Sequence, residues 1–234
     1  MLSNQFSYFA LGKSIENAST TLQTAFIGHQ IEHHTQVTST NDIAIARGKA
    51  GAADGTVVIA EHQTAGRGRY GRRWEAPPGK CILASVVLRH RLLQDQVPLP
   101  NLIGAIAITR AIRTKYELDA QIKPPNDVRI RKKKVAGVLT ELAYDAQQQA
   151  FFVLGFGVNV NIALADFPPE LRETATSLRI ASAHSENQDT QICRTSLLHA
   201  ILYQLEKTYL QLKAAETDLI MKQFEELREN ESSD

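Results

Sequence analysis

Residues 57–88 read VVIAEHQTAGRGRYGRRWEAPPGKCILASVVL, and they place a stretch rich in glycine and arginine between two apolar segments. The apolar segments, residues 57–60 and 81–88, are uncharged and rich in β-branched side chains, which predicts two buried β-strands. The stretch between them, residues 66–74 with the sequence GRGRYGRRW, is called the Gly-Arg loop below. The sequence therefore predicts a loop that lies between two strands.

The Gly-Arg loop concentrates positive charge. Arg67, Arg69, Arg72 and Arg73 lie within seven residues, and the nearest acid is Glu75. Glycine permits backbone conformations that other residues avoid, and the planar guanidinium group pairs with phosphates and carboxylates through two hydrogen bonds. The alternative is an exposed basic loop or an Arg-Gly patch for nucleic acid, but such patches usually repeat in low-complexity surroundings, whereas this one occurs once and ends at the only tryptophan. We therefore expect the loop to order around an anionic ligand.

Outward from this loop, apolar periodicity predicts both helices and strands. Residues 38–42 supply hydroxyl and amide side chains that cap a short helix ending near Gly51. Further helices are expected at residues 102–116, 195–215 and 217–228, and further strands at residues 121–123, 128–130, 135–143 and 151–162. The fold class is therefore α+β, with a mixed or antiparallel central sheet and helices packed on it. Residues 1–30 are expected to be a poorly specified lead-in to a domain over residues 31–234.

A second polar cluster follows the central helix. Lys123-Pro124-Pro125-Asn126-Asp127 predicts a rigid turn, and Lys134 opens the returning arm of the hairpin beside it. An ammonium group held near a carboxylate and an amide suits phosphate chemistry, in which the lysine stabilises negative charge and Asp127 positions Mg²⁺ or the lysine itself.

A run of basic residues surrounds the tip of this hairpin. Arg129, Arg131, Lys132 and Lys133 are interpreted as a solvated tip, because charge runs usually lie in water.

Composition excludes several classes of function. The formal net charge is +1, from 26 basic and 25 acidic residues, so no field over the whole surface would attract nucleic acid or an anionic membrane. The seven histidines and the two cysteines form no metal-ligand spacing, and Cys81 and Cys193 are expected to be core thiols in a reducing compartment. Neither a signal peptide nor a transmembrane stretch is evident, which favours a cytoplasmic protein. No motif for a covalent nucleophile and no Walker loop is present.

Five motifs occur in the order, and at roughly the distances, that are typical of the biotin protein ligase family. They are Ser39-Thr40-Asn41, residues 63–74, residues 123–127, residues 134–139 and residues 155–159. From about residue 31 onward the chain therefore resembles that family, and the Gly-Arg loop is the most specific part of the resemblance. The resemblance implies the class II synthetase-like fold of biotin and lipoate ligases. It also implies an ATP-dependent enzyme that makes biotinyl-5'-AMP and transfers biotin to a lysine of the biotin carboxyl carrier domain of acetyl-CoA carboxylase.

The resemblance also implies roles for individual residues and a need for biotin, ATP and Mg²⁺. Lys134, Asp127 and Arg69 match catalytic positions, and Asp127 matches a Mg²⁺ position. The positions that match biotin or adenylate contacts are Ser39, Thr40, Asn41, Gln63, Arg67, Gly68, Arg69 and Lys134. Those that match ATP contacts are Arg67, Arg72, Trp74, Asn126, Asp127 and Asn159.

Three departures from the family pattern leave alternatives open. Pro124 stands where the family usually has tryptophan, and neither an N-terminal winged helix-turn-helix module nor a complete C-terminal β-barrel is evident, so no transcriptional repression is expected. The alternatives are a lipoate or octanoate ligase or transferase of the same fold, whose Arg-Gly-Gly and histidine signatures are not evident, and a protein that binds biotin without turnover. A homodimer is an outcome that exposed sheet edges allow.

Overall fold

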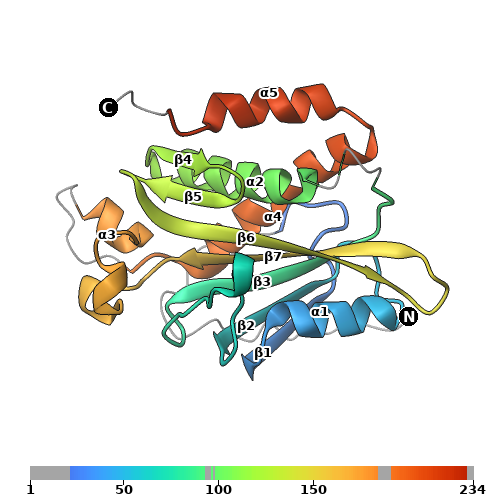
Figure 1. The fold of residues 1–234 in the computed structure, drawn as a ribbon, viewed down its shortest axis with the longest axis horizontal. Coiled ribbons are helices and arrows are strands. Elements are labelled where there is room, and N and C mark those ends of the chain that lie inside the picture. Colours follow the sequence, from blue (N-terminus) through green and yellow to red (C-terminus); the bar gives the residue numbers. More distant parts are fainter. Residues whose placement is uncertain (1–21, 93–95, 97, 184–190, 231–234) are drawn as a thin grey trace.

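A mixed seven-stranded sheet forms the centre of the computed structural model, which describes residues 22–92, 96, 98–183 and 191–230 (Figure 1). Its strands run in the order β1-β2-β3-β7-β6-β5-β4. Their bounds are β1 Ile31–Val37, β2 Val57–Gln63, β3 Cys81–Leu88, β4 Ala120–Lys123, β5 Asp127–Ile130, β6 Lys133–Tyr144 and β7 Ala150–Asn159. Only the β1–β2 pair is parallel among these described strands. The predicted α+β class with a mixed sheet is therefore confirmed.

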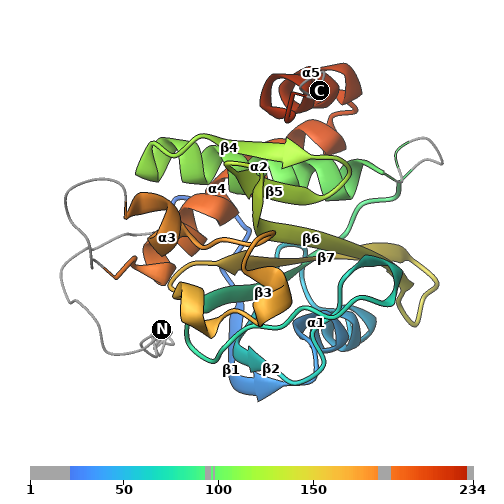
Figure 2. The ribbon, with the colours of Figure 1, turned by 60° about the vertical axis from the view of Figure 1, so that its left-hand side comes forward.

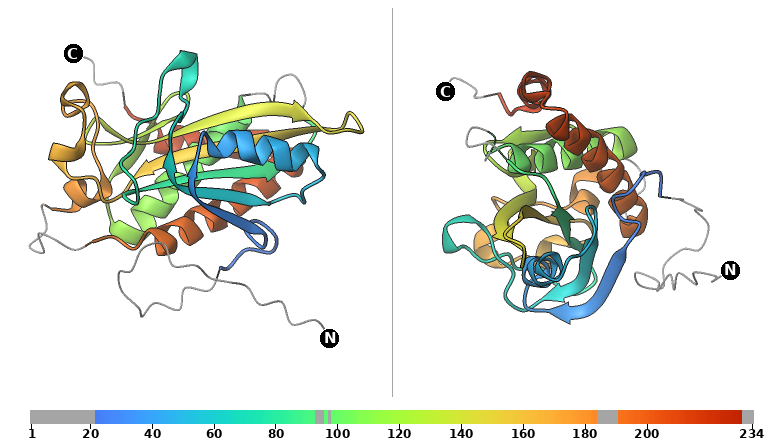
Figure 3. Two further views of the ribbon diagram at one scale, coloured as in Figure 1. Left: turned by 90° about the horizontal axis from the view of Figure 1, so that it is seen from below. Right: turned by 90° about the vertical axis from the view of Figure 1, so that its right-hand side faces the viewer.

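Helices cover both faces of the sheet. They are α1 Thr40–Lys49, α2 Leu99–Tyr116, the short α3 Leu178–Ser182, α4 Arg194–Lys213 and α5 Thr217–Leu227. The pair α2 and α4 packs on one face and α1 on the other (Figure 3), while α5 lies outside α2 (Figure 2).

Successive side chains of a strand point to opposite faces of the sheet. Val86 belongs to the large core under α2 and α4, whereas Val87 packs with Ala44 of α1 and Phe151 of β7. This alternation follows from the two-residue period of a strand. Strand β3 is buried along its whole length because both of its faces are covered, which explains why Ser85 is its only polar residue.

Most predicted elements lie within a few residues of their observed bounds, but strand β1 and the five-residue helix α3 were not predicted, and one strand was predicted too long. Strand β1 was not predicted, because its sequence IEHHTQV lies at the sheet edge, where most of its side chains are exposed and no apolar alternation is needed. The predicted strand at residues 151–162 ends at Asn159.

The boundary of the lead-in at residue 30 was also wrong. Ile27 is fully buried, and the buried carboxylate of Glu206 on α4 accepts hydrogen bonds from the backbone N–H groups of Ala25, Phe26 and Ile27 at 2.6, 2.9 and 2.9 Å. Residues 22–30 are thus part of the folded body, and the rest of the predicted lead-in, residues 1–21, lies outside the described residues.

The two cysteines differ in their surroundings. Cys81 is buried in β3, but Cys193 precedes α4 and is exposed, so the expectation of two core thiols is wrong for Cys193. No helix among the described residues is long and apolar enough to span a membrane.

Candidate active site

A cavity of about 560 Å³ lies where α1, the Gly-Arg loop and strands β4 to β7 meet. Every residue that the sequence predicted for the site contributes to its wall. These residues are Ser39, Thr40, Asn41, Gln63, Arg67, Gly68, Arg69, Arg72, Trp74, Asn126, Asp127, Lys134 and Asn159. The volume falls in the range of small-molecule and cofactor sites.

Glycines on two adjacent strands form the floor of this cavity. Gly137 of β6 is paired with Gly157 of β7, and the ring of Trp74 lies over both. A Cβ atom at Gly157 would lie 2.5 Å from Cε2 of Trp74, and one at Gly155 would overlap the side-chain amide of Asn41. These strand positions therefore accommodate only glycine while Trp74 and Asn41 keep their places.

The N-terminus of α1 contributes a buried polar network. Ser39, Thr40 and Asn41 are each less than 5% exposed. The backbone N–H of Thr40 donates to Oε1 of Gln63 at 2.6 Å, which joins α1 to the end of β2. Ser85 Oγ lies 2.7 Å from Thr40 Oγ1 and 2.6 Å from Asn41 Oδ1.

Ser85 was missed by the sequence analysis. The available signal was a single hydroxyl in the otherwise apolar strand β3, where a buried polar group needs a partner. Ser85 therefore helps to hold the α1 residues that line the cavity.

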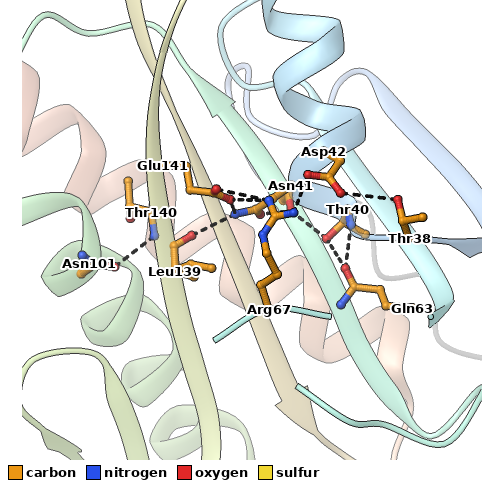
Figure 4. Close-up of polar contacts among 11 residues, drawn as sticks. Thr38, Thr40, Asn41, Asp42, Gln63, Arg67, Asn101, Leu139, Thr140 and Glu141 are labelled. Atoms are coloured by element: carbon orange, nitrogen blue, oxygen red, sulfur yellow. Dashed lines mark hydrogen bonds and ion pairs between the residues drawn. The ribbon is translucent and has the colours of Figure 1, made fainter. Parts of the chain in front are cut away.

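Arg67 connects the Gly-Arg loop to α1 and to β6 (Figure 4). Its guanidinium group donates to Asp42 Oδ1 at 2.5 Å and to Glu141 Oε2 at 2.9 Å. Glu141, which the sequence analysis also missed, accepts a further hydrogen bond from Asn41 Nδ2 at 2.5 Å. Burial disfavours the charge of Arg67, but the hydrogen bonds to Glu141 and Asp42 outweigh it and raise the pKa of the guanidinium group. In this arrangement Arg67 is a tether at the cavity rim.

The Gly-Arg loop folds back on itself over the cavity. The N–H of Gly68 donates to the carbonyl of Arg72 at 2.7 Å, and the N–H of Trp74 donates to that of Gly66 at 3.0 Å. At the tip, Tyr70 and Gly71 have φ angles of 58° and 73°, and the Tyr70 side chain is 83% exposed. Gly71 adopts this left-handed backbone conformation without strain, because it has no Cβ atom.

Two arginines of the loop face the nucleotide half of the predicted site. Arg69 Nη1 lies 3.5 Å from Asn126 Oδ1. This contact crosses the cavity from the loop to the turn between β4 and β5. Arg72 has no ion-pair partner among the described residues and lines the cavity. The loop therefore brings positive charge to the opening.

Lys134 and Asp127 form an ion pair within the β5–β6 hairpin. Lys134 Nζ lies 2.6 Å from Asp127 Oδ1 and 5.6 Å from the centre of the Trp74 ring. The backbone N–H of Lys134 donates a hydrogen bond to the carbonyl of Thr174, and the carbonyl of Lys134 accepts one from the N–H of Thr176. Both hydrogen bonds are 2.8 Å long, and they fix the backbone at Lys134. The predicted closeness of this lysine to the Asn126-Asp127 turn agrees with the geometry.

Two asparagines of the predicted nucleotide region are occupied by structural bonds. Asn126 Nδ2 donates to the carbonyl of Val138 at 2.6 Å, and Asn159 Nδ2 donates to that of Thr176 at 3.0 Å. Both side chains are buried. Their amides hold the turn and the 174–176 segment in place, while the Oδ1 atom of Asn126 is directed to Arg69.

Arg129 corrects one expectation. The hairpin tip consists of Arg131 and Lys132, which are exposed and have φ angles of 51° and 63°. Arg129 instead lies inside β5, two residues from Asp127, and contributes to the cavity wall with 23% of its side chain exposed. The solvated-tip interpretation is therefore wrong for Arg129, because the alternation of β5 directs residues 127 and 129 to the same face.

Residues 31–159, more than half of the chain, match the model of the biotin/lipoate A/B protein ligase family. The fold and the site thus define a ligase-type domain, and the chain belongs to the biotin/lipoate A/B protein ligase family.

The similar curated proteins carry ligase names, among them that of a biotin ligase. The chain is 35% identical to the bifunctional ligase/repressor BirA of Bacillus spizizenii over 80% of its own length and 56% of that protein. It is 39% identical to the biotin--[acetyl-CoA-carboxylase] ligase of Mycobacterium tuberculosis over 64% of its length and 54% of the relative. The chain therefore spans about half the length of these curated relatives.

Two solved structures share the fold. The biotin protein ligase of Aquifex aeolicus in complex with biotin and ATP gives a TM-score of 0.67 at 26% identity, covering 80% of this chain and 72% of that one. The biotin protein ligase of Leishmania major in complex with biotinyl-5-AMP gives 0.68 at 25% identity, covering 86% and 82%.

Proposed function

We propose that this chain is a biotin--[biotin carboxyl carrier protein] ligase that forms biotinyl-5'-AMP from biotin and ATP. The observation that carries the proposal is a single cavity that joins the buried polar network of Ser39 to Asn41, the arginines of the Gly-Arg loop and the Lys134–Asp127 pair. Structures of the same fold hold biotin with ATP, or biotinyl-5-AMP. At its α1 end the cavity is lined by hydroxyl and amide groups, and the charge of Arg67 is paired there with Asp42 and Glu141. The other end is cationic, so the cavity suits a ligand with a neutral head and a phosphate tail.

In the first step, a biotin carboxylate oxygen attacks the α-phosphorus of ATP. A bond forms between that oxygen and phosphorus, the bond from phosphorus to the oxygen bridging to the β-phosphate breaks, and pyrophosphate leaves. Lys134 stabilises the negative charge that shifts between these oxygens, and Arg69 and Arg72 bind phosphate oxygens. Since the substrate carboxylate is the nucleophile, the chain needs no nucleophile of its own.

In the second step, a lysine amine of the carrier domain attacks the acyl carbon of the adenylate. The amide bond forms, the bond from carbon to the phosphate oxygen breaks, AMP leaves and the amine loses a proton. The Gly-Arg loop, tethered at its base through Arg67 to Asp42 and Glu141, shields the mixed anhydride from water. Gln63 and Gly68 would complete the contacts to the biotinyl adenylate, and Trp74, Asn126 and Asn159 those to the nucleotide.

Asp127 is the residue that would hold Mg²⁺. No group of three His, Cys, Asp or Glu side chains that could bind a metal is present among the described residues. Mg²⁺ that arrives with ATP needs only one or two carboxylates, because phosphate oxygens and water fill its other positions, so a lone Asp127 fits. When bound, the ion would neutralise phosphate charge, while Asp127 also orients Lys134.

The setting and the assembly are further parts of the proposal. A cytoplasmic location is supported by the two free cysteines, neither of which forms a disulfide. The exposed edge strand β1 supports a homodimer. The acceptor is the carrier domain of acetyl-CoA carboxylase, which the name of the mycobacterial relative supports.

The test is pyrophosphate release with biotin and ATP, followed by transfer of labelled biotin to a carrier-domain lysine. We expect release that requires both substrates and label on one lysine. If lipoate or octanoate is transferred and biotin is not, the chain belongs to the lipoate branch of the family. Tight biotin binding without pyrophosphate release would instead identify a binding protein.

A further inference from the structure

Arg129 lies beside the reacting groups although none of the matching motifs includes it. On β5 it is paired in register with Lys134 of β6, and Asp127 lies two residues before it on the same face. Like charges directly opposite one another on adjacent strands are destabilising. The retention of an arginine here therefore calls for compensating negative charge.

Part of the compensation comes from the segment that follows α5. Glu229 Oε2 lies 3.6 Å from Arg129 Nη1, and the two side chains are 16% and 23% exposed. The N–H of Glu229 donates to the carbonyl of Ile122 at 2.8 Å, so this segment runs along the outer edge of β4. Glu229 is thereby fixed in position and holds the Arg129 side chain.

The guanidinium group of Arg129 has a hydrogen-bond donor that no acceptor among the described residues uses. A separation of 3.6 Å is a charge contact and not a hydrogen bond. The Nε atom of Arg129 is buried and has no hydrogen-bond acceptor among the described residues. A buried donor without an acceptor is costly, and an arginine with free donors is suited to bidentate pairing with phosphate.

We infer that Arg129 is a further binding residue for the polyphosphate of ATP, held ready by Glu229. This inference rests on the proposed function. In the sheet order, β7 carries Gly155 under Asn41, β6 carries Lys134 and β5 carries Arg129. A ligand with its neutral end at α1 and its α-phosphate at Lys134 would place its β- and γ-phosphates on the β5 side, next to Arg129.

The experiment compares Arg129→Gln with Arg131→Gln, which removes the same charge two residues away at the exposed tip, outside the cavity. Titration calorimetry with inorganic pyrophosphate and with ATP measures binding without turnover, and steady-state assays give KM for ATP and for biotin. We expect Arg129→Gln to weaken pyrophosphate binding and to raise KM for ATP, each by about tenfold, as loss of a charged hydrogen bond predicts. KM for biotin should change less than about twofold, and Arg131→Gln should resemble the parent.

A second variant separates a loss of phosphate binding from a loss of stability. Arg129→Gln leaves Glu229 without its partner, so the double variant with Glu229→Gln removes both charges; it should regain stability but not pyrophosphate affinity. Unchanged pyrophosphate affinity in a folded Arg129→Gln or double variant would overturn the inference. If the parent binds pyrophosphate through Arg129 yet does not turn over biotin, the proposed function fails and the phosphate site stands.

Discussion

Lys134 Nζ lies 2.6 Å from Asp127 Oδ1, and the two residues come from opposite arms of the β5–β6 hairpin. The register of that hairpin, not the distance along the chain, decides that the ammonium group meets this carboxylate. Since the backbone of Lys134 is bonded on both sides to residues 174–176, its side chain extends from a rigid point.

Replacing this lysine tests its place in the reaction. We expect Lys134→Met to reduce biotin-dependent pyrophosphate release by about 10²- to 10³-fold, the usual cost of losing a group that stabilises transition-state charge. Lys133→Met is the matched control, because Lys133 Nζ contacts the carbonyl of Arg172 at 3.2 Å instead of the cavity. An equal reduction of pyrophosphate release in the two variants would show that Lys134 has no special part in the reaction.

The bridge from Arg69 to Asn126 predicts slower release of the adenylate. If this contact helps the Gly-Arg loop to cover the ligand, Arg69→Gly should raise the dissociation rate of biotinyl-5'-AMP by about tenfold, because a charged hydrogen bond is lost. Stopped-flow displacement measures this rate. A rate equal to or lower than that of the parent would contradict the loop's covering role.

The contact between Gly155 and Asn41 predicts a coupled pair of substitutions. Gly155→Ala would force a Cβ atom into the amide of Asn41, and we expect a loss of about 1–3 kcal/mol in the free energy of unfolding and weaker biotin binding. In an Asn41→Ala background the obstacle is gone, so the same substitution should cost much less. Denaturation of the four proteins of this cycle measures the coupling, and strictly additive costs would show that the two residues do not touch.

Glu206 predicts a purely structural effect. Its carboxylate accepts three backbone hydrogen bonds from residues 25–27, so Glu206→Gln should lower the stability by about 1.5–3 kcal/mol because one oxygen is exchanged for a donor. Glu226→Gln, an exposed position on α5, is the control and should be nearly neutral. Affinity for biotin should be unaffected in both; a stable Glu206→Gln protein would contradict the anchoring of residues 22–30.

The two cysteines are expected to differ in reactivity, because one is buried and the other exposed. Burial raises the pKa of the Cys81 thiol to about 12, so Cys81 stays protonated and shielded at pH 7 to 9. Cys193 is exposed, so a reagent in solution can reach its thiol. Alkylation of the native protein at pH 7 to 9 followed by mass spectrometry should therefore label Cys193 before Cys81. Comparable labelling of Cys81 would show that β3 opens readily.

Local sequence was sufficient for much of the fold. Strand β3 was predicted with its observed bounds, and the hairpin that carries Asp127 and Lys134 was located, because apolar periodicity and turn-forming residues act over a few neighbouring positions. The order of the motifs likewise indicated the family and the residues that line the cavity.

Tertiary structure alone decided what those residues contact. Arg67 meets Glu141, Glu206 binds the N–H groups of residues 25–27, and Glu229 reaches Arg129, and in each case the partners lie far apart in the sequence. Strand β1 belongs to the sheet through its pairing with β2 and not through its own weakly apolar sequence. Such contacts arise only when the sheet order and register bring distant segments together, since no local pattern encodes which charge will face which.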